Sequence, residues 1–383
     1  MMQKHCLNKP FPVVLRTMKK ILVVFGTRPE AIKMSPLVKE LKNKRNIKTL
    51  VCVTAQHRKM LDQVLQTFNI IADFDLNIMK GHQTLFDITC LVLNGMRDVL
   101  EEVRPDMVLV HGDTTTAFAV SLACFYLHIP VSHIEAGLRT FQMDAPYPEE
   151  FNRQTVDLIS NYHFAPTEFA RDNLLREGKC AERIFVTGNT VVDALKETIS
   201  NDFHHTELDW VGNNRLILVT AHRRENIGNP MRNMFRAICR IAQEYNDVKV
   251  IYPMHPNPCV RQIASEILQD NENVHLIEPL DVTSFHNFMN SSYVILTDSG
   301  GIQEESVYLG KPTLVMRKTT ERVEGIPSGI VSLLGTEENT IYEGIKMLLD
   351  NASPCYSAKE FSSLYGDGDA SKKIADILQQ ILE

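Results

Sequence analysis

Ile-Leu-Val-Val-Phe-Gly-Thr-Arg-Pro-Glu, residues 21–30, gives the clearest indication of the architecture. Residues 21–25 form a continuous apolar run rich in β-branched side chains, which is typical of a parallel strand buried on both faces. Gly26 interrupts the run, and Pro29 stands where the first turn of a helix accepts proline. Apolar residues then recur at helical spacing as far as Leu41. The stretch therefore predicts a buried strand followed at once by a helix.

The same order of strand and helix repeats along the chain, which predicts parallel sheets with helices on both faces. The repeats fall into two sets, so the predicted fold class is α/β, with two Rossmann-like doubly wound domains facing a cleft. Further strands are predicted over 49–54, 107–111, 131–134, 216–220, 248–252, 274–277, 294–297 and 313–316, and helices over 58–68, 114–127, 231–245 and 370–382.

The length of 383 residues also favours two domains, because it exceeds what one compact core usually holds. Residues 201–214 are polar and weakly periodic, so we place the linker at about 190–213. The N-terminal domain is then expected over 18–190 and the C-terminal domain over 191–367. Residues 1–17 are predicted to be a loose extension, since their apolar part is too short for a signal peptide.

The composition is that of an ordinary globular protein, with 44% hydrophobic and 23% charged residues. A net charge of -7 disfavours a nucleic-acid partner, which usually selects a basic surface. No apolar run is long enough to span a bilayer, so no membrane partner is expected. The eight scattered cysteines contain no Cys-x-x-Cys pair, and we interpret them as reduced thiols of a cytoplasmic protein.

Polar segments follow the predicted strands in both halves, namely 26–30, 111–114, 135–139, 222–226 and 298–301. Any one of them is explained equally well by a helix cap. Together they favour a binding site, because the carboxyl ends of parallel strands are where such folds bind ligands.

Ser299-Gly300-Gly301, ahead of a predicted helix, has a more specific use. Two glycines allow close approach of a ligand, and the helix N-terminus directs N–H groups and partial positive charge at an anion such as a diphosphate. The segment lacks the Gly-Lys-Ser/Thr of a Walker motif, and 26–30 lacks the later glycines of a dinucleotide fingerprint. No nicotinamide or other cofactor is therefore expected.

Acids and bases accompany these segments. Asp113 and Glu135, at strand ends, are interpreted as functional carboxylates, and the stiff Pro146–Glu150 loop carries two more. For Glu150 a cap or a surface charge is the preferred interpretation. For Lys33 the local spacing favours a solvated helix face. No His, Cys and Asp pattern has metal-ligand spacing, so no metal is expected.

These segments together resemble the non-hydrolysing UDP-N-acetylglucosamine 2-epimerases. The resemblance covers nearly the whole chain from Met18, and its combination of motifs is specific. The motifs are GTRPEAIKM (26–34), TAQHR (54–58), HGDTT (111–115), EAGLRT (135–140), PEE (148–150), NR (152–153), GNT (188–190), HRREN (222–226), DSGGIQEE (298–305) and TER (320–322).

The resemblance implies a fold of the glycosyltransferase-B type, in which the C-terminal helix, about 368–383, returns to the first domain. It implies anti elimination of UDP from UDP-N-acetylglucosamine, a 2-acetamidoglucal intermediate and re-addition of UDP to give UDP-N-acetylmannosamine. It implies catalytic Asp113, Glu135, Glu149 and His222, without fixing which carboxylate removes the proton at carbon 2. The implied substrate-binding residues are Arg28, Lys33, Arg153, Phe285 near uracil, Ser299, Gly300, Gly301, and Glu305 on the ribose.

Two further implications concern regulation and assembly. Gln56, His57 and His255 match positions that bind a second UDP-N-acetylglucosamine as activator in some family members. The family also suggests a homodimer.

Three alternatives remain open at this point. A UDP-sugar glycosyltransferase of the same fold would use the same diphosphate cradle, since fold does not fix function. A hydrolysing 2-epimerase would release free N-acetylmannosamine. A non-catalytic UDP-sugar sensor would keep the cradle without needing the carboxylates.

Overall fold

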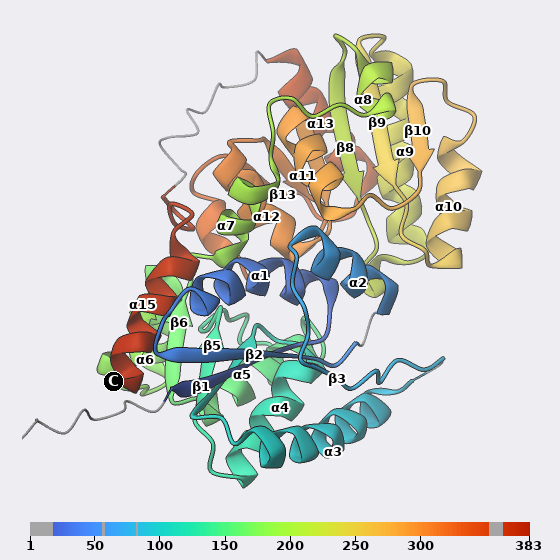
Figure 1. Ribbon diagram of the computed structural model, residues 1–383. Helices are drawn as coiled ribbons and strands as arrows, with labels where there is room; N and C mark the ends of the chain where they lie inside the picture. The colour runs from blue at the N-terminus through green and yellow to red at the C-terminus, as the bar shows by residue number, and fades with distance from the viewer. Residues whose placement is uncertain (1–17, 56–57, 82, 352–362) are drawn as a thin grey trace, which may run out of the picture.

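The computed structural model describes residues 18–55, 58–81, 83–351 and 363–383, so the predicted extension 1–17 lies outside the described residues. Two parallel sheets with flanking helices form two domains, one above the other in Figure 1. This confirms the predicted doubly wound α/β class. None of the helices in the described part of the chain is long and apolar enough to cross a membrane.

The N-terminal sheet has the strand order β3-β2-β1-β4-β5-β6-β7, with parallel pairing throughout. Its strands are β1 (Lys19–Phe25), β2 (Ile47–Val53), β3 (Phe74–Asp75), β4 (Met107–His111), β5 (Val131–Ile134), β6 (Tyr162–Ala165) and β7 (Ile184–Val186). The associated helices are α1 (Arg28–Lys42), α2 (Arg58–Thr67), α3 (Leu85–Val103), α4 (Thr115–Tyr126), α5 (Glu149–Ile159), α6 (Glu168–Arg176) and α7 (Thr190–Thr198).

The C-terminal sheet has the order β10-β9-β8-β11-β12-β13, again parallel. Its strands are β8 (Arg215–Thr220), β9 (Val248–Pro253), β10 (Val274–Ile277), β11 (Val294–Thr297), β12 (Thr313–Val315) and β13 (Val331–Leu333). Its helices are α8 (Thr206–Val211), α9 (Asn229–Glu244), α10 (Pro258–Leu268), α11 (Val282–Ser291), α12 (Gly300–Leu309) and α13 (Glu338–Asp350).

Residues 21–25 of strand β1 have no polar face because both faces of the sheet are covered there. Ile21, Val23 and Phe25 pack into the core shared with α1, whereas Leu22 and Val24 pack into the core on the opposite face of the sheet. A strand covered by helices on both sides must be apolar at every position. Burial of each such side chain contributes about 1.5–3 kcal/mol, so this run anchors both layers of the domain.

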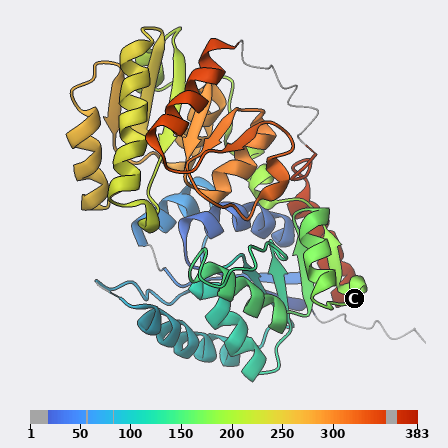
Figure 2. The same cartoon turned by 180° about the vertical axis from the view of Figure 1, so that it is seen from behind.

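The C-terminal helix α15 (Ala370–Leu382) lies against the lower, N-terminal domain in both views, although the chain has just left the upper one (Figures 1 and 2). Ile374 and Leu378 are buried in the core around β1 and α1. The carboxylate of Asp193 in α7 accepts the backbone N–H groups of Ala370 and Ser371 at 3.3 and 2.8 Å. A carboxylate at this position satisfies free N–H groups of the helix N-terminus.

The predicted linker over 190–213 is wrong in its local structure. It contains helix α7 and the short helix α8, and Val191, Val192 and Leu195 of α7 are completely buried. Helix α7 packs on α1, α12 and α15, so contacts with both domains fix it as a helix.

Candidate active site

The corner between β1 and α1 is rigid because one buried carboxylate organises it. Thr27 caps α1, and Glu30 accepts the N–H groups of Gly26 and Thr27 at 3.1 and 2.8 Å, completing a capping box. The other Glu30 oxygen accepts a hydrogen bond from the Thr114 hydroxyl at 2.7 Å. The loops that follow β1 and β4 are therefore joined, and Arg28 projects from a fixed helix start.

Lys33 of α1 is buried, with only 6% of the residue exposed, so the interpretation of a solvated helix face is wrong. Its ammonium pairs with Glu135 and lies 3.0 Å from Oε2 of Glu304, which belongs to the other domain. Burial alone would lower the pKa of Lys33, but the two carboxylates raise it above its ordinary value. Lys33 therefore stays charged between the domains.

Glu135 stands at the end of β5 in a left-handed backbone conformation, with φ 68°. This strained conformation, uncommon for a non-glycine residue, turns its side chain toward Lys33 and the Asn189 amide, which donates to Oε1 at 2.9 Å. Burial would raise the pKa of Glu135, but Lys33, His111 and Arg322 hold it well below its usual range. Glu135 is accordingly an ionised carboxylate.

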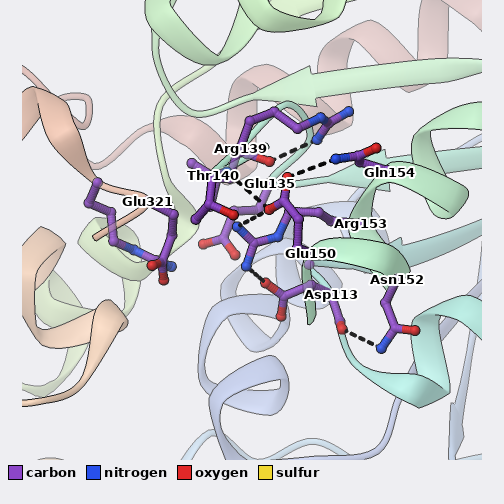
Figure 3. A network of polar contacts seen from close by, with 12 residues as sticks. Asp113, Glu135, Arg139, Thr140, Glu150, Asn152, Arg153, Gln154 and Glu321 are labelled. Carbon is purple, nitrogen blue, oxygen red and sulfur yellow. Dashed lines mark hydrogen bonds and ion pairs between the residues drawn. The ribbon is translucent and has the colours of Figure 1, made fainter. Parts of the chain in front are cut away.

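Asp113, after β4, forms an ion pair with Arg153 of α5 (Figure 3). Figure 3 also shows Glu321, from the C-terminal domain, to the left of this pair. Glu150 is completely buried and accepts the N–H groups of Thr140 and Phe141 at 3.0 and 2.9 Å. Glu150 is thus a structural residue that accepts backbone N–H groups. The alternative expectation, a surface charge, is wrong because the residue is buried.

Glu149 begins α5 next to Asp113. Burial, and then the negative charge of Asp113, raise the pKa of Glu149 above its ordinary value. Oε2 of Glu149 and Nε and Nη1 of Arg153 are buried without a hydrogen-bond partner among the described residues. Unsatisfied polar atoms are rare in protein interiors, so this group suits a polar ligand.

The opposite side of the site is the N-terminus of α12. Ser299 is the N-cap residue, but its side chain makes no capping hydrogen bond. A Cβ on Gly300 would lie 2.6 Å from Nη1 of Arg322, whereas a Cβ on Gly301 would meet nothing within 4 Å. Gly300 therefore permits close protein packing, and Gly301 leaves open space in front of a helix N-terminus that favours an anion.

Asp298 holds the loop after β8 beside this terminus. Its buried carboxylate accepts the N–H groups of His222 and Arg223, and the Asn226 amide, at 2.9–3.1 Å. This orients His222, whose side chain remains 41% exposed and stacks on His255 with ring centroids 5.5 Å apart. Gln56 and His57, predicted with His255, lie outside the described residues.

The remaining predicted residues lie on the C-terminal side or bridge to it. Glu305 is buried in α12, 3.7 Å from Nε2 of His286, and Phe285 is half-buried in α11. Arg28 donates to the carbonyl of Leu280, 3.0 Å away across the domains.

Reasoning from residue types missed a buried ion network. Arg322 pairs with Glu321 and donates to Glu304 at 3.0 Å, and Arg317 lies 3.2 Å from Glu321. Burial raises the pKa of Glu304. The available signal was two acids, Glu304 and Glu305, in an otherwise weakly polar helix behind Gly300-Gly301. Among residues 18–55, 58–81, 83–351 and 363–383, no group of three or more His, Cys, Asp or Glu has the arrangement of a metal site.

The fold and this site define a two-domain α/β protein of the glycosyltransferase-B type, in which Lys33 joins Glu135 of one domain to Glu304 in helix α12 of the other. Residues 39–379 match the family model described as UDP-N-acetylglucosamine 2-epimerase. The chain therefore belongs to the UDP-N-acetylglucosamine 2-epimerase family, which confirms the family resemblance.

Individual relatives agree with this placement. A UDP-N-acetylglucosamine 2-epimerase of Bacillus subtilis is 55% identical over 359 residues, covering 94% of each chain. S. aureus MnaA, solved as a co-structure with UDP, is 50% identical with a TM-score of 0.91, covering 95% of this chain and 97% of that one. The Neisseria meningitidis UDP-GlcNAc 2-epimerase bound to UDP-GlcNAc is 47% identical with a TM-score of 0.89, covering 94% and 100%.

Proposed function

We propose that the protein interconverts UDP-N-acetylglucosamine and UDP-N-acetylmannosamine without net hydrolysis. The observation that carries the proposal is the facing arrangement of the site. Asp113, Glu135 and Glu149 come from the N-terminal domain, and the α12 N-terminus comes from the other. Relatives bound to UDP and to UDP-GlcNAc support the ligand class.

UDP would be held mainly by the C-terminal domain. Its diphosphate suits the open space at Gly301 and the N–H groups that begin α12. Arg28 and Arg153 would add positive charge, and His222 would lie beside the leaving group. Glu305 is proposed to accept the ribose hydroxyls, and Phe285 to contact uracil.

The reaction would proceed by elimination and re-addition. A carboxylate takes the proton from carbon 2 while the bond from carbon 1 to the UDP oxygen breaks, giving 2-acetamidoglucal and UDP. The UDP oxygen then bonds to carbon 1 again, and a proton is returned to carbon 2 on the opposite face. Atoms and charge balance, and no net oxidation occurs. The cations and the helix terminus would stabilise the charge that develops on UDP.

The environments of the carboxyl groups support a division of labour. Lys33 and Arg322 keep Glu135 ionised, whereas burial and the charge of Asp113 raise the pKa of Glu149. Carboxyl groups whose pKa values are pushed apart are typical of acid–base pairs. We propose that Glu149 is one of the proton-transfer groups. Glu135 and Asp113 would be further acid–base groups that approach the same sugar from other sides.

Proton NMR with purified protein and UDP-N-acetylglucosamine in heavy water tests the proposal. We expect UDP-N-acetylmannosamine to appear, with the carbon-2 proton replaced by deuterium. Free N-acetylmannosamine with stoichiometric UDP would identify a hydrolysing enzyme. Sugar transfer to an acceptor without epimer would identify a glycosyltransferase. Binding with no turnover would identify a sensor.

Two related predictions need their own measurements. Activation by UDP-N-acetylglucosamine through Gln56, His57 and His255 would make the forward rate depend sigmoidally on the UDP-N-acetylglucosamine concentration, which a hyperbolic dependence would contradict. The predicted homodimer would have about twice the chain mass of 43.5 kDa by light scattering.

A further inference from the structure

A second buried polar cluster lies behind the site and is centred on Asp157 of α5, which is completely buried. Oδ1 of Asp157 accepts hydrogen bonds from Nδ1 of His133 at 2.6 Å and from Nδ1 of His163 at 3.1 Å. Oδ2 accepts hydrogen bonds from Nη2 of Arg139 at 2.7 Å and from the backbone N–H of Gly137 at 3.2 Å. Burial would raise the pKa of Asp157, but His133, His163 and Arg139 hold it well below its usual range. Asp157 therefore acts here only as a hydrogen-bond acceptor.

The His133 ring is bonded on both sides to acceptors. Nδ1 meets the Asp157 carboxylate, and Nε2 lies 2.8 Å from the carbonyl oxygen of Gly112. A neutral imidazole has one N–H donor and one lone-pair acceptor, and a carbonyl oxygen cannot donate. A neutral ring would therefore place a nitrogen lone pair against an oxygen lone pair. Only the doubly protonated imidazolium satisfies both contacts.

The surrounding charges balance this cation. Arg139 is bonded to Glu177 at 2.6 and 2.7 Å, so His133 and Arg139 are matched by Asp157 and Glu177. His163 needs only its Nδ1 proton to donate to Asp157. His111, on the neighbouring strand, stays neutral because burial lowers its pKa to about 4. Buried charges persist when they are paired in this way.

The cluster joins the elements that carry the proposed acid–base groups. Gly112 directly precedes Asp113, His133 is two residues before Glu135, and Asp157 belongs to the helix that begins with Glu149. Gly112 itself has φ +62°, so its turn has a conformation that ordinary side chains rarely adopt and that needs fixing from outside. His133 is 0% exposed and has no access to a ligand.

We propose that His133 is a positioning residue, doubly protonated because both ring nitrogens face acceptors, which fixes the turn at Gly112 and Asp113 relative to β5 and α5 and transfers no proton itself. Its effect on turnover rests on the proposed function, whereas its charge state does not. The rate should depend on it because misplacement of reacting groups by about 1 Å costs about a hundredfold in rate.

Nitrogen-15 NMR of the full chain tests the charge state without substrate. At about pH 8.5 an ordinary histidine is neutral, so an imidazolium stands out. We expect both ring nitrogens of His133, assigned by correlation to its backbone, to show the shifts of protonated nitrogens. One nitrogen with an unprotonated shift would overturn the proposal, and this holds even if variants at position 133 fail to fold.

Kinetics test the positioning role with a matched pair of variants. His133→Gln should lower kcat for carbon-2 exchange by about ten- to a hundredfold, with the Kd for UDP changed by less than about threefold. His163→Gln removes a hydrogen bond to the same carboxylate but does not contact Gly112, so its kcat should stay within about threefold of the wild type. Equal losses in both variants, or lost UDP binding in His133→Gln, would overturn the positioning role. A wild-type protein without carbon-2 exchange would refute the proposed function instead, and the NMR result would still stand.

Discussion

The Nζ atom of Lys33 lies 3.0 Å from Oε2 of Glu304, so helix α1 of one domain and helix α12 of the other share a buried ion pair. The side chain of Glu304 is 0% exposed, and it also accepts Nε of Arg322 at 3.0 Å. Lys33 simultaneously pairs with Glu135. The contact between the domains and the charge on a proposed site carboxylate are therefore linked through one ammonium group.

The first prediction concerns this pair. Glu304→Gln should destabilise the protein by about 3 kcal/mol, because Lys33 and Arg322 lose a buried counter-charge. It should also lower kcat about tenfold or more. Glu197→Gln is the matched control, since Glu197 pairs with Lys39 of the same helix α1 at the surface and should cost less than about 1 kcal/mol. Denaturant unfolding of both variants measures the two stability losses. Equal losses would show that the interdomain ion pair stabilises the protein no more than the surface pair does.

Substitution of the three proposed carboxyl groups should lower turnover while leaving UDP binding nearly unchanged. Asp113→Asn, Glu135→Gln and Glu149→Gln should each slow carbon-2 exchange at least about a hundredfold, as expected for lost acid–base catalysis. UDP affinity, measured by calorimetry, should change less than about fivefold because UDP is proposed to bind the other domain. Glu182→Gln, an exposed acid remote in sequence from these groups, is the control. Full activity in any of the three would remove that residue from the mechanism.

Stability should depend on pH through His111. Burial lowers the pKa of His111 to about 4, and its Nε2 has no hydrogen-bond partner among the described residues. Between about pH 6.5 and about pH 4, His111 binds a proton in the unfolded chain but not in the folded chain. The free energy of unfolding therefore falls as the pH falls, by up to about 3 kcal/mol. His111→Gln should flatten this slope, while His204→Gln, at an exposed site, should keep it. Urea unfolding across that range provides the comparison, and equal slopes in all three proteins would contradict the prediction.

The strands were predictable because their signal is local. Met107–His111, Val131–Ile134, Val274–Ile277 and Val294–Thr297 agree with the expected bounds, and each is a short run rich in apolar, β-branched residues between helical segments. Short edge strands such as β7 and β13 were missed, because three residues carry too little pattern to separate from loop.

The site was less predictable, because its decisive contacts are distant in sequence. Lys33 looked solvated from its own helix, yet its partners are 102 and 271 residues away. Glu304 was overlooked beside Glu305, since nothing local distinguishes an acid that meets a cation from one exposed to water. Helix α7 was taken for linker because its burial against α1, α12 and α15 is invisible in a window of its own residues.

The glycines at the start of α12 give the sharpest test of the anion site, because the structure assigns them different constraints. In Gly300→Ala the new Cβ would lie 2.6 Å from Nη1 of Arg322 and 2.7 Å from Oε1 of Glu321, so overpacking should cost about 1–3 kcal/mol of stability. In Gly301→Ala the Cβ would meet no protein atom within 4 Å, and stability should hold or rise, since alanine favours a helix by up to about 1 kcal/mol. The same methyl group would occupy the proposed approach of the diphosphate, so UDP should bind at least about tenfold more weakly, a loss of about 1.4 kcal/mol. Thermal unfolding and UDP titration of both variants separate the two effects, and an unchanged UDP affinity in Gly301→Ala would place the diphosphate elsewhere.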